Sequence, residues 1–486
     1  MRRRLSVAEF ILEHMFEAVS DGDLIEVMGE ATRDESTAIA QRLAAVAELF
    51  VRRSGDVAER EWWCVDHCDA VAAEIAAVQN ISHARAVAQV QFACNLWHRL
   101  PTVAKVFASG VIDFRLVSTI INRTENVDDA VMPALDEAIA RHCTKWMKLS
   151  RPKLRDRVDQ WVAKFDPAGV RVPTAVNDNR YLNIDPASPG MAGLSGHLHA
   201  TDGAALDQRL DALAATVCDN DPRTKEQRRA DATGPLARGE AQLACQCGLA
   251  HCPAAAQRAA VDAAVIHVLA EQATVEGTSD APGYLPGFGI LPAESVREVA
   301  ATAQLKPVRI PAGPPDPGYR PSAITREFVQ WRDLTCRWPG CDRPVAKCDV
   351  DHTIPYPAGF THASDLKHYC GVHHLIKTFH GGWTEQQLPD GTMILTAPTG
   401  HTYVSEAHGA ALFPTLAQST GELPVPTTVK EPSPYRELMM PRRKQTRAQD
   451  RRDRINAERS QRTELIAEEE RQRQAWLAAN YEPPPF

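Results

Sequence analysis

The sequence predicts a multidomain protein of the α+β class. Apolar residues recur at three- and four-residue spacing through the first 172 residues, which is typical of helices, and short stretches that favour strands appear only after about residue 175. Proline-rich runs then separate the later parts of the chain. We therefore expect a mainly helical N-terminal region, a small α/β middle unit, a compact cysteine- and histidine-rich module and a basic C-terminal helix.

We predict the domain boundaries at the positions where the sequence pattern changes. A chain of 486 residues is long enough for about three domains. We expect the following parts: 1–174 as a helical domain, 175–305 as the α/β unit, 306–322 as a Pro-rich linker, 323–412 as the module, 413–440 as a Pro/Thr-rich spacer and 441–486 as the basic tail.

Local signals support the first two regions. Ser82 in "ISHARAVAQVQFACNLWHRL" is typical of a helix N-cap, and Pro101 follows the end of this predicted helix. The stretch "FASGVIDFRLVSTIINRT" has the cadence of a helix-turn-helix, although a turn within a helical bundle produces it more often than a DNA reader. "RYLNID" and "LSGHLHATDG" favour strands, and "AAVDAAVIHVLAE" favours either a helix or a buried strand.

Composition excludes several broad classes. The net charge of −8 and the pI near 6.1 mean that any polyanion would have to bind a local basic patch. The N-terminus lacks the apolar run of a secretory signal, and no stretch is long and apolar enough to span a membrane. We expect a cytoplasmic protein with reduced thiols, in which Cys94, Cys143 and Cys218 are small core residues.

The segment from residue 336 to residue 383 contains four cysteines and six histidines. Cys336 and Cys341 flank a Pro-Gly turn, and Cys370 lies three residues before a histidine near a predicted helix. Three thiolates and one imidazole form the closed tetrahedron of a structural Zn²⁺ site. Two unrelated pairs are the alternative, and spacing alone does not decide whether His373 or His374 would bind the zinc.

An Asp-His pair lies between these two groups. "KCDVDH" alternates like a strand, so Asp351 and His352 should point to opposite sides, and "TIPYPAG" should end that strand. "DLKHYCGVHHLIKTF" then favours a helix. A strand, a long loop and a helix joined by zinc form the outline of a ββα-metal module.

The pattern of Asp-His, a proline, Asp-Leu and C-x-x-H-H-x-x-K resembles the HNH endonuclease motif. With its long helical N-terminal half, "QLPDGTMILTAPTGHTY" and the ending "EPPPF", the whole chain resembles the actinobacterial, chiefly mycobacterial, 13E12 repeat family. Proteins of that family pair a domain of unknown function, number 222, with a C-terminal HNH nuclease module. The resemblance is specific over about residues 320–410 and at the C-terminus.

The resemblance implies roles for individual residues. His352 would be the general base, and Asp351 with His374 would hold one catalytic Mg²⁺ or Mn²⁺ ion. The family pattern assigns His373 to the structural zinc, together with Cys336, Cys341 and Cys370. Lys377 could contact a phosphate or could be an ordinary exposed lysine.

One residue departs from the HNH pattern. Asp365 stands where the motif usually has Asn, and an ionised Asp accepts hydrogen bonds but cannot donate them. It could still hold the loop through a backbone N–H or raise the pKa of a nearby histidine. We therefore count Asp365 among the catalytic-site residues and as a reason for weakened activity.

Two further features could bind ligands. "CQCGLAHCP" brings together Cys245, Cys247 and Cys252 beside a histidine, either as a second Zn²⁺ site that lacks a nameable fourth ligand or as a reduced loop. The tail has nine Lys and Arg against three acids over residues 442–462. It is either a solvated charged helix or a phosphate-binding arm beginning with Arg442, Arg443 and Lys444.

The resulting prediction is an HNH-type, metal-dependent DNA endonuclease that hydrolyses phosphodiester bonds, associates with the nucleoid when bound to DNA and could act as a homodimer. The alternative is a catalytically weak or inactive DNA-binding protein of a mobile-element-associated family. Residues 321–410 contain seven Lys and Arg against nine acids. The module would therefore need help from another part of the chain to hold DNA.

Overall fold

The computed structural model divides the chain into two compact units: residues 1–172 together with 309–486 form unit 1, and residues 173–308 form unit 2. The chain combines helices with small sheets, and its N-terminal region is mainly helical, as predicted. No helix among the described residues is long and apolar enough to cross a membrane. The structure describes residues 16, 19–54, 58–172, 180–198, 200–249, 251–252, 254, 267–286, 288–301, 303–424 and 435–480.

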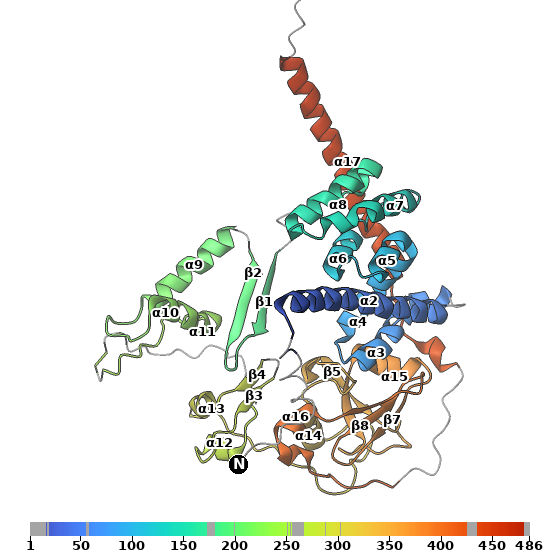
Figure 1. Cartoon of the computed structure of the whole chain (residues 1–486). Coiled ribbons are helices and arrows are strands. Elements are labelled where there is room, and N and C mark those ends of the chain that lie inside the picture. The colour runs from blue at the N-terminus through green and yellow to red at the C-terminus, as the bar shows by residue number, and fades with distance from the viewer. Residues whose placement is uncertain are drawn as a thin grey trace, which may run out of the picture. The chain divides into compact units, whose positions relative to one another are not determined.

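Unit 1 begins with a bundle of helices around one large apolar core (Figure 1). The Ser82 hydroxyl accepts a hydrogen bond from the backbone N–H of Arg85, which confirms the predicted N-cap. The helices are α2 (Asp21–Ser54), η1 (Ala58–Trp62), α3 (His67–Gln79), α4 (His83–Cys94), η2 (Asn95–Arg99), α5 (Pro101–Ala108), α6 (Phe114–Arg123), α7 (Met132–His142), η3 (Cys143–Trp146), α8 (Arg151–Phe165) and η4 (Pro167–Gly169).

The helix-turn-helix cadence corresponds to α5, the turn at Gly110 and α6. Gly110 has φ +78°, and a Cβ there would lie 2.7 Å from the Arg33 carbonyl oxygen of α2. Leu116 and Ile120 of α6 are fully buried in the bundle core. The turn therefore packs inside the bundle, which favours the bundle interpretation over a DNA reader.

The cysteine- and histidine-rich module follows in the same unit. Its strands β5 and β6 pair antiparallel, with Cys348 opposite Cys370 and Asp351 opposite Lys367, and α15 begins directly after β6. The expected helix from residue 365 was therefore too long, because residues 366–370 form a strand. The elements are α14 (Ala323–Asp333), η6 (Val345–Lys347), β5 (Cys348–His352), β6 (Leu366–Cys370), α15 (Gly371–Phe379), β7 (Thr384–Gln387), β8 (Met393–Thr396), β9 (Thr402–Ser405), α16 (His408–Leu412) and η7 (Pro414–Ala417).

The module shares a core with the N-terminal helices. Trp63 and Ala73 are buried in one apolar cluster with Trp338 and Tyr369 of the module. Gly340 in the Pro-Gly turn approaches the end of α3 so closely that a Cβ would lie 2.6 Å from the Ile81 carbonyl oxygen. This packing explains why the module and the N-terminal bundle belong to one unit.

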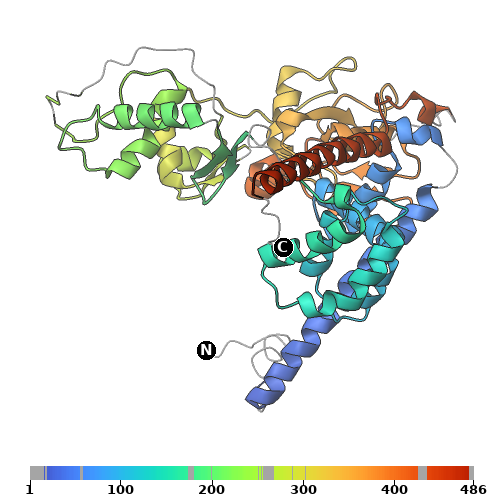
Figure 2. The same cartoon turned by 90° about the horizontal axis from the view of Figure 1, so that it is seen from above.

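The C-terminal helix α17 (Arg447–Asn480) also belongs to unit 1, after the short η8 (Arg436–Met439). It forms the predicted basic helix. Figures 1 and 2 show its first half lying along the N-terminal helices, where its side chains bond to residues of α3 and to the loops around α6 and η4.

Unit 2 contains two small antiparallel hairpins and five helices among its described residues. The strand predicted from "RYLNID" is confirmed as β1. The strand predicted from "LSGHLHATDG" is confirmed only as far as His197, because residues 200–203 belong to α9. Most of the "AAVDAAVIHVLAE" segment lies outside the described residues. The elements are β1 (Tyr181–Pro186), β2 (Ala192–His197), α9 (Ala200–Ala214), α10 (Lys225–Asp231), α11 (Thr233–Ala237), α12 (Gln272–Val275), β3 (Gly283–Leu285), β4 (Gly289–Leu291) and α13 (Ala293–Ala300).

Candidate metal sites and active site

The structure brings together the four residues predicted to bind structural zinc. The ligand atoms of Cys336, Cys341, Cys370 and His373 all lie within 4.8 Å of one another. His373 Nδ1 is 3.5 Å from the Cys336 sulfur and 3.3 Å from the Cys370 sulfur. Nδ1 is thus the nitrogen that faces the cluster, and the donor set matches a closed Zn²⁺ site.

The surroundings of this cluster favour metal ligation. His373 is 1% exposed, and the Trp338 ring stacks on it with an interplanar angle of 2°. Burial lowers the pKa of His373 and so keeps the imidazole in its neutral, metal-binding form. Hydrogen bonds with Cys336 and Cys341 lower the pKa of the Cys370 thiol, so this cluster already favours a thiolate.

Asp351 and His374 also converge. His374 Nε2 lies 3.5 Å from Asp351 Oδ1, and His374 Nδ1 lies 3.3 Å from Asp349 Oδ2. A carboxylate oxygen and an imidazole nitrogen this close together would be suitable ligands for one divalent cation. The sequence placed these residues on different elements, and the β5–β6–α15 arrangement brings them together.

The other oxygen of Asp351 is engaged by two ammonium groups. Lys367 and Lys377 lie 2.9 Å and 2.5 Å from Asp351 Oδ2, and both also pair with Glu385 on β7. Burial alone would raise the pKa of Asp351, but these two lysines lower it to about 2. Lys377 is therefore neither an exposed lysine nor a free phosphate ligand, because its ammonium belongs to this network.

Sequence reasoning missed Lys367 and Glu385. The Lys367 side chain is fully buried, and the Tyr369 hydroxyl donates to Glu385 Oε2 at 2.9 Å. Alternation along β6 could have indicated that Lys367 shares a face with Tyr369, but nothing in the sequence placed β7 beside them. The carboxylates of Asp351 and Glu385 and the ammonium groups of Lys367 and Lys377 form a cluster of nearly zero net charge beside His374.

His352 lies on the opposite face of β5, as the strand pattern predicted. Its Nε2 is 3.0 Å from the Thr361 hydroxyl oxygen, and that hydroxyl donates its proton to the Gly318 carbonyl oxygen. Nε2 must therefore be the donor to Thr361, which leaves Nδ1 as the basic nitrogen. Burial lowers the pKa of His352, so the imidazole is neutral near pH 7.

The Pro-rich segment before the module contributes to this arrangement. Tyr319 stacks on the His352 ring with centroids 5.3 Å apart, and the Asp316 backbone N–H bonds to the Thr361 carbonyl oxygen. Composition predicted only a linker over 306–322, because the contacts of a proline-rich segment depend on the fold around it.

Asp365 holds the loop that follows β5. Its Oδ1 accepts a hydrogen bond from the Ile354 N–H at 2.9 Å, while the Thr353 N–H donates to the Asp365 carbonyl oxygen. Its Oδ2 is buried and has no hydrogen-bond partner among the described residues. Burial raises the pKa of Asp365 to about 6.

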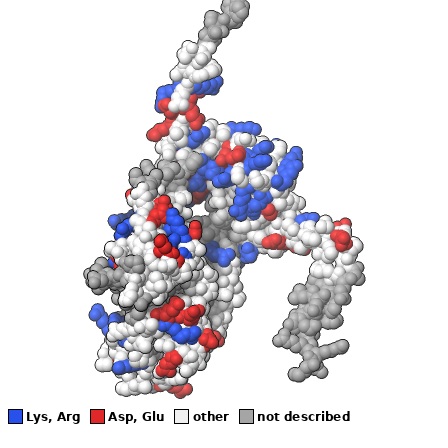
Figure 3. All heavy atoms as spheres, turned by 90° about the vertical axis from the view of Figure 1, so that its left-hand side faces the viewer, with Lys and Arg blue, Asp and Glu red and all other residues white. Residues whose placement is uncertain are grey.

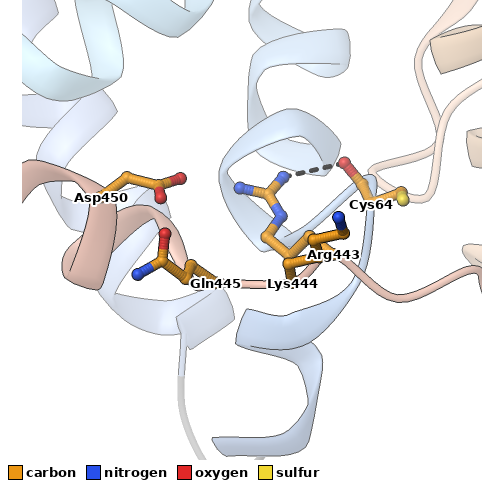
Figure 4. Close-up of a pocket in the computed structure, with 5 residues that line it drawn as sticks. All are labelled: Cys64, Arg443, Lys444, Gln445 and Asp450. Atoms are coloured by element: carbon orange, nitrogen blue, oxygen red, sulfur yellow. Dashed lines mark hydrogen bonds between the residues drawn. The ribbon is translucent and has the colours of Figure 1, made fainter.

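The predicted phosphate-binding residues lie just before α17. Arg443 donates to the carbonyl oxygens of Trp63 and Cys64, both at 2.8 Å. Arg443 and Lys444 line an open depression with Cys64, Gln445 and Asp450, shown in Figure 4, which contains none of the predicted catalytic residues. Arg442 is exposed and lies 3.6 Å from Glu59.

Several arginines of α17 are paired with acids of the helical bundle. Arg447 contacts Asp66 and Asp69 at 2.5 Å each, and Asp69 in turn contacts His83, whose ring packs edge-on against His373 of the zinc-type cluster. Further along the helix, Arg454 pairs with Glu125 and Arg459 with Asp166. Much of the basic character of α17 is therefore used to attach this helix to the bundle.

A second basic segment, which sequence reasoning missed, surrounds α8. α8 lies near the top of Figure 1, and Lys and Arg side chains gather on the upper part of the face shown in Figure 3. Residues 141–164 contain eight exposed cations and only two acids, Asp156 and Asp159, and within the described part of the chain none of the eight forms an ion pair. They are Arg141, Lys145, Lys148, Arg151, Lys153, Arg155, Arg157 and Lys164.

Unit 2 supplies the missing fourth member of the other cysteine cluster. The sulfur atoms of Cys218, Cys245, Cys247 and Cys252 all lie within 4.8 Å of one another. The prediction that Cys218 is a core residue was wrong, because its side chain is only half-buried and faces these thiols. The sequence did not reveal this relationship, because a helical segment lies between Cys218 and Cys245 in the chain.

Comparisons with known proteins place the chain in a family. The family model described as "Domain of unknown function (DUF222)" matches residues 30–333 and so ends at the last residue of α14. The chain is 41% identical to the uncharacterized proteins Rv2100 and Rv3776 of Mycobacterium tuberculosis, in each case over 96% of this chain and 94% of the relative. A shorter M. tuberculosis relative, "Uncharacterized protein in est 3'region", is 40% identical over 63% of this chain and 95% of its own length. No solved structure matches. Together with the mainly helical N-terminal region, these matches show that the chain belongs to the DUF222 family.

Proposed function

We propose that the protein is a metal-dependent endonuclease that hydrolyses phosphodiester bonds in DNA. The observation that carries this proposal is the convergence of Asp351 and His374, with Oδ1 and Nε2 3.5 Å apart, on a hairpin and helix that also hold a four-ligand zinc-type cluster. This combination supports the resemblance of the segment to HNH endonucleases of the 13E12 repeat family.

The donor set suits Mg²⁺ or Mn²⁺. Asp351 Oδ1 and His374 Nε2 would be the two protein ligands, while Lys367 and Lys377 keep Asp351 ionised through its other oxygen. An ion bound there would stabilise negative charge on the scissile phosphate and on the leaving oxygen. Asp351 needs to release no proton on binding, because its pKa is already about 2.

His352 is suited to take the proton from the attacking water. Its hydrogen bond to Thr361 fixes Nε2 as the protonated nitrogen and leaves Nδ1 as the proton acceptor. Burial and the stacked Tyr319 ring fix the orientation of the imidazole. The lowered pKa of His352 keeps the base unprotonated at neutral pH.

The exposed basic segment around α8 is the best candidate to hold the DNA backbone. Its eight cations are free of ion pairs within the described residues, unlike Arg447, Arg454 and Arg459 of α17. Phosphate contacts of this kind supply affinity without sequence specificity. Phosphate binding by Arg442, Arg443 and Lys444 stays a prediction. We propose the cations around α8 as a further site of phosphate contact.

Plasmid cleavage tests the proposal. We expect wild-type protein to nick or cut supercoiled DNA with Mg²⁺ or Mn²⁺, and His352→Ala to cleave at least about 100-fold more slowly with unchanged zinc content. His401→Ala, which changes an exposed histidine of the same module, is the matched control and should cleave normally. If wild-type and His352→Ala proteins are equally inert on supercoiled, linear and single-stranded DNA, the nuclease proposal is wrong.

Two observations favour a second candidate, a DNA-binding protein that has lost cleavage. Asp365 replaces the usual Asn, and Lys367 and Lys377 already neutralise one oxygen of Asp351. In that case DNA binding would persist without added divalent metal, and His352→Ala would bind DNA as tightly as the wild-type protein.

A further inference from the structure

The four cysteines of unit 2 form a cluster separate from every residue of the proposed nuclease site. Cys218 lies just after α9, and the other three lie within residues 245–252 after α11. Cys218 Sγ and Cys245 Sγ are 3.5 Å apart, and all four sulfurs lie within 4.8 Å of one another. A tetrahedral Zn²⁺ site with Zn–S bonds of about 2.3 Å would place its sulfurs about 3.8 Å apart.

Backbone N–H groups donate to three of these four sulfur atoms. The Asn220 N–H donates to the Cys218 sulfur, the Cys247 N–H to the Cys245 sulfur and the Ala254 N–H to the Cys252 sulfur. Each donor lies two residues beyond its acceptor. The Arg343 N–H donates to Cys341 at the same spacing in the zinc-type cluster of unit 1, so both clusters use the same local turn.

Polar contacts hold the two cysteine-bearing segments in register. The buried Asp221 carboxylate accepts hydrogen bonds from the Arg223 guanidinium at 2.8 Å and from the Gln246 N–H at 2.9 Å. Arg223 also donates to the Ala244 carbonyl oxygen at 2.7 Å, and the Leu243 N–H donates to the Thr216 hydroxyl at 2.9 Å. These bonds fix the positions of Cys218, Cys245 and Cys247 before any metal binds.

This part of unit 2 has few other means of stabilisation. Between residues 241 and 254 the described chain contains no helix or strand, and Leu243 is its only fully buried apolar residue among those described. Gly248, with φ +70°, turns the chain directly after Cys247. A metal ion would therefore replace the missing core of this segment.

We propose that Cys218, Cys245, Cys247 and Cys252 bind a second Zn²⁺ ion, which cross-links the end of α9 to the loop after α11. Four thiolate ligands close the coordination sphere, so the ion is structural and has no position for a substrate. Binding converts four thiols and one Zn²⁺ into a tetrathiolate complex and releases four protons. The protein then contains two independent structural zinc sites, one in each unit.

Zinc analysis of the full chain, purified under reducing conditions, tests this inference. We expect two zinc ions per chain in the wild-type protein and one in both Cys218→Ser and Cys336→Ser. Cys64→Ser, which changes an exposed cysteine outside both clusters, is the matched control and should keep two. A wild-type ratio of one, or a Cys218→Ser protein that keeps two, would overturn the inference.

Two further measurements remain decisive if Cys218→Ser folds poorly. Cys218→His retains a ligand at this position, so it should keep two metal ions. The Co²⁺ spectrum of the wild-type protein should be that of one site with three thiolates and one site with four. The spectrum of Cys218→His should change to that of two sites with three thiolates each. Mass spectrometry of the protein purified without reductant identifies the competing arrangement. A Cys218–Cys245 disulfide in the metal-free, folded protein would contradict a zinc site. Because plasmid cleavage does not depend on this cluster, failure here leaves the proposed nuclease function unaffected.

Discussion

Asp365 Oδ1 accepts a hydrogen bond from the Ile354 backbone N–H at 2.9 Å, while Asp365 Oδ2 is buried without a partner among the described residues. One half of the carboxyl group thus holds the loop after β5, and the other half is suited to carry a proton. This relationship explains how Asp can stand at a position where HNH motifs usually have Asn, and it links the site to pH.

The pH dependence of stability should reflect Asp365. Its pKa in the folded protein is raised from 3.8 to about 6, so the folded state binds the proton more tightly than the unfolded state. The stabilisation from this group is therefore complete below about pH 4 and is lost as the pH rises through 6. Asp365→Asn should remove this loss, up to about 3 kcal/mol between pH 4 and pH 8. Urea denaturation at several pH values measures it.

Asp342→Asn is the control for this change, because Asp342 is an exposed carboxylate of the same module. It should leave the pH profile of the free energy of unfolding unchanged. If the free energy of unfolding of Asp365→Asn depended on pH in the same way as that of the wild-type protein, ionisation of Asp365 would not destabilise the folded state. If the hydrogen bond to Ile354 N–H is also what positions the catalytic loop, Asp365→Asn should cleave DNA at least as fast as the wild-type protein.

The attachment of α17 to the bundle should contribute measurably to stability. Arg447→Ala removes the guanidinium nearest to the carboxylates of Asp66 and Asp69, whose side chains are 3% and 7% exposed, and leaves Asp66 only the Arg443 guanidinium at 3.5 Å. Loss of a partner for buried charges should lower the free energy of unfolding by about 2–4 kcal/mol. Arg473→Ala removes a guanidinium that is 72% exposed and should change it by less than about 0.5 kcal/mol. Equal effects of the two substitutions would argue against this attachment.

His373 and His374 should have separable roles. His373→Ala should lower the zinc content by one ion and destabilise unit 1, because His373 is buried and its Nδ1 faces the three thiols. His374→Ala should keep the zinc but require at least about tenfold more Mn²⁺ for half-maximal cleavage, since Asp351 would be the remaining protein ligand. Zinc analysis and a Mn²⁺ titration of plasmid cleavage measure the two effects. Zinc loss in His374→Ala would reverse the assignment.

The basic segment around α8 should determine the salt dependence of DNA binding. Replacing Lys153 and Arg157 together by Ala should make the slope of log affinity against log salt shallower by roughly two, because each phosphate contact contributes about one. The double change Arg471→Ala with Arg473→Ala also removes two exposed cations, but from a helix where both pair with neighbouring glutamates. Fluorescence anisotropy with a labelled duplex measures the slopes. An unchanged slope in the α8 variant would exclude this segment as the DNA contact.

Local patterns predicted much of the fold. Helical periodicity located the N-terminal helices, Ser82 capped the predicted helix, and the two stretches that favour strands contributed to β1 and β2, although the second was predicted to continue into residues that form α9. The assignment failed at residues 366–370, where helix-compatible residues pair with β5 instead. Propensity is a weak guide for five residues, and the partner strand decided their conformation.

By itself, the sequence determined the ligand chemistry of the two metal-type clusters. The spacing of Cys336 and Cys341, and of Cys370 and a following histidine, predicted two ligand pairs, because a tight turn fixes distances only within a pair. The family resemblance assigned His373 to the zinc. Only the tertiary structure identified Cys218 as the fourth thiol of the other cluster and the pairing of Lys367 and Lys377 with Asp351 and Glu385. It also distinguished the two basic segments. Arginines of α17 pair with acids of the bundle, whereas the cations around α8 face solvent. Such contacts join residues distant in the chain, and their energies depend on which surfaces the fold brings together.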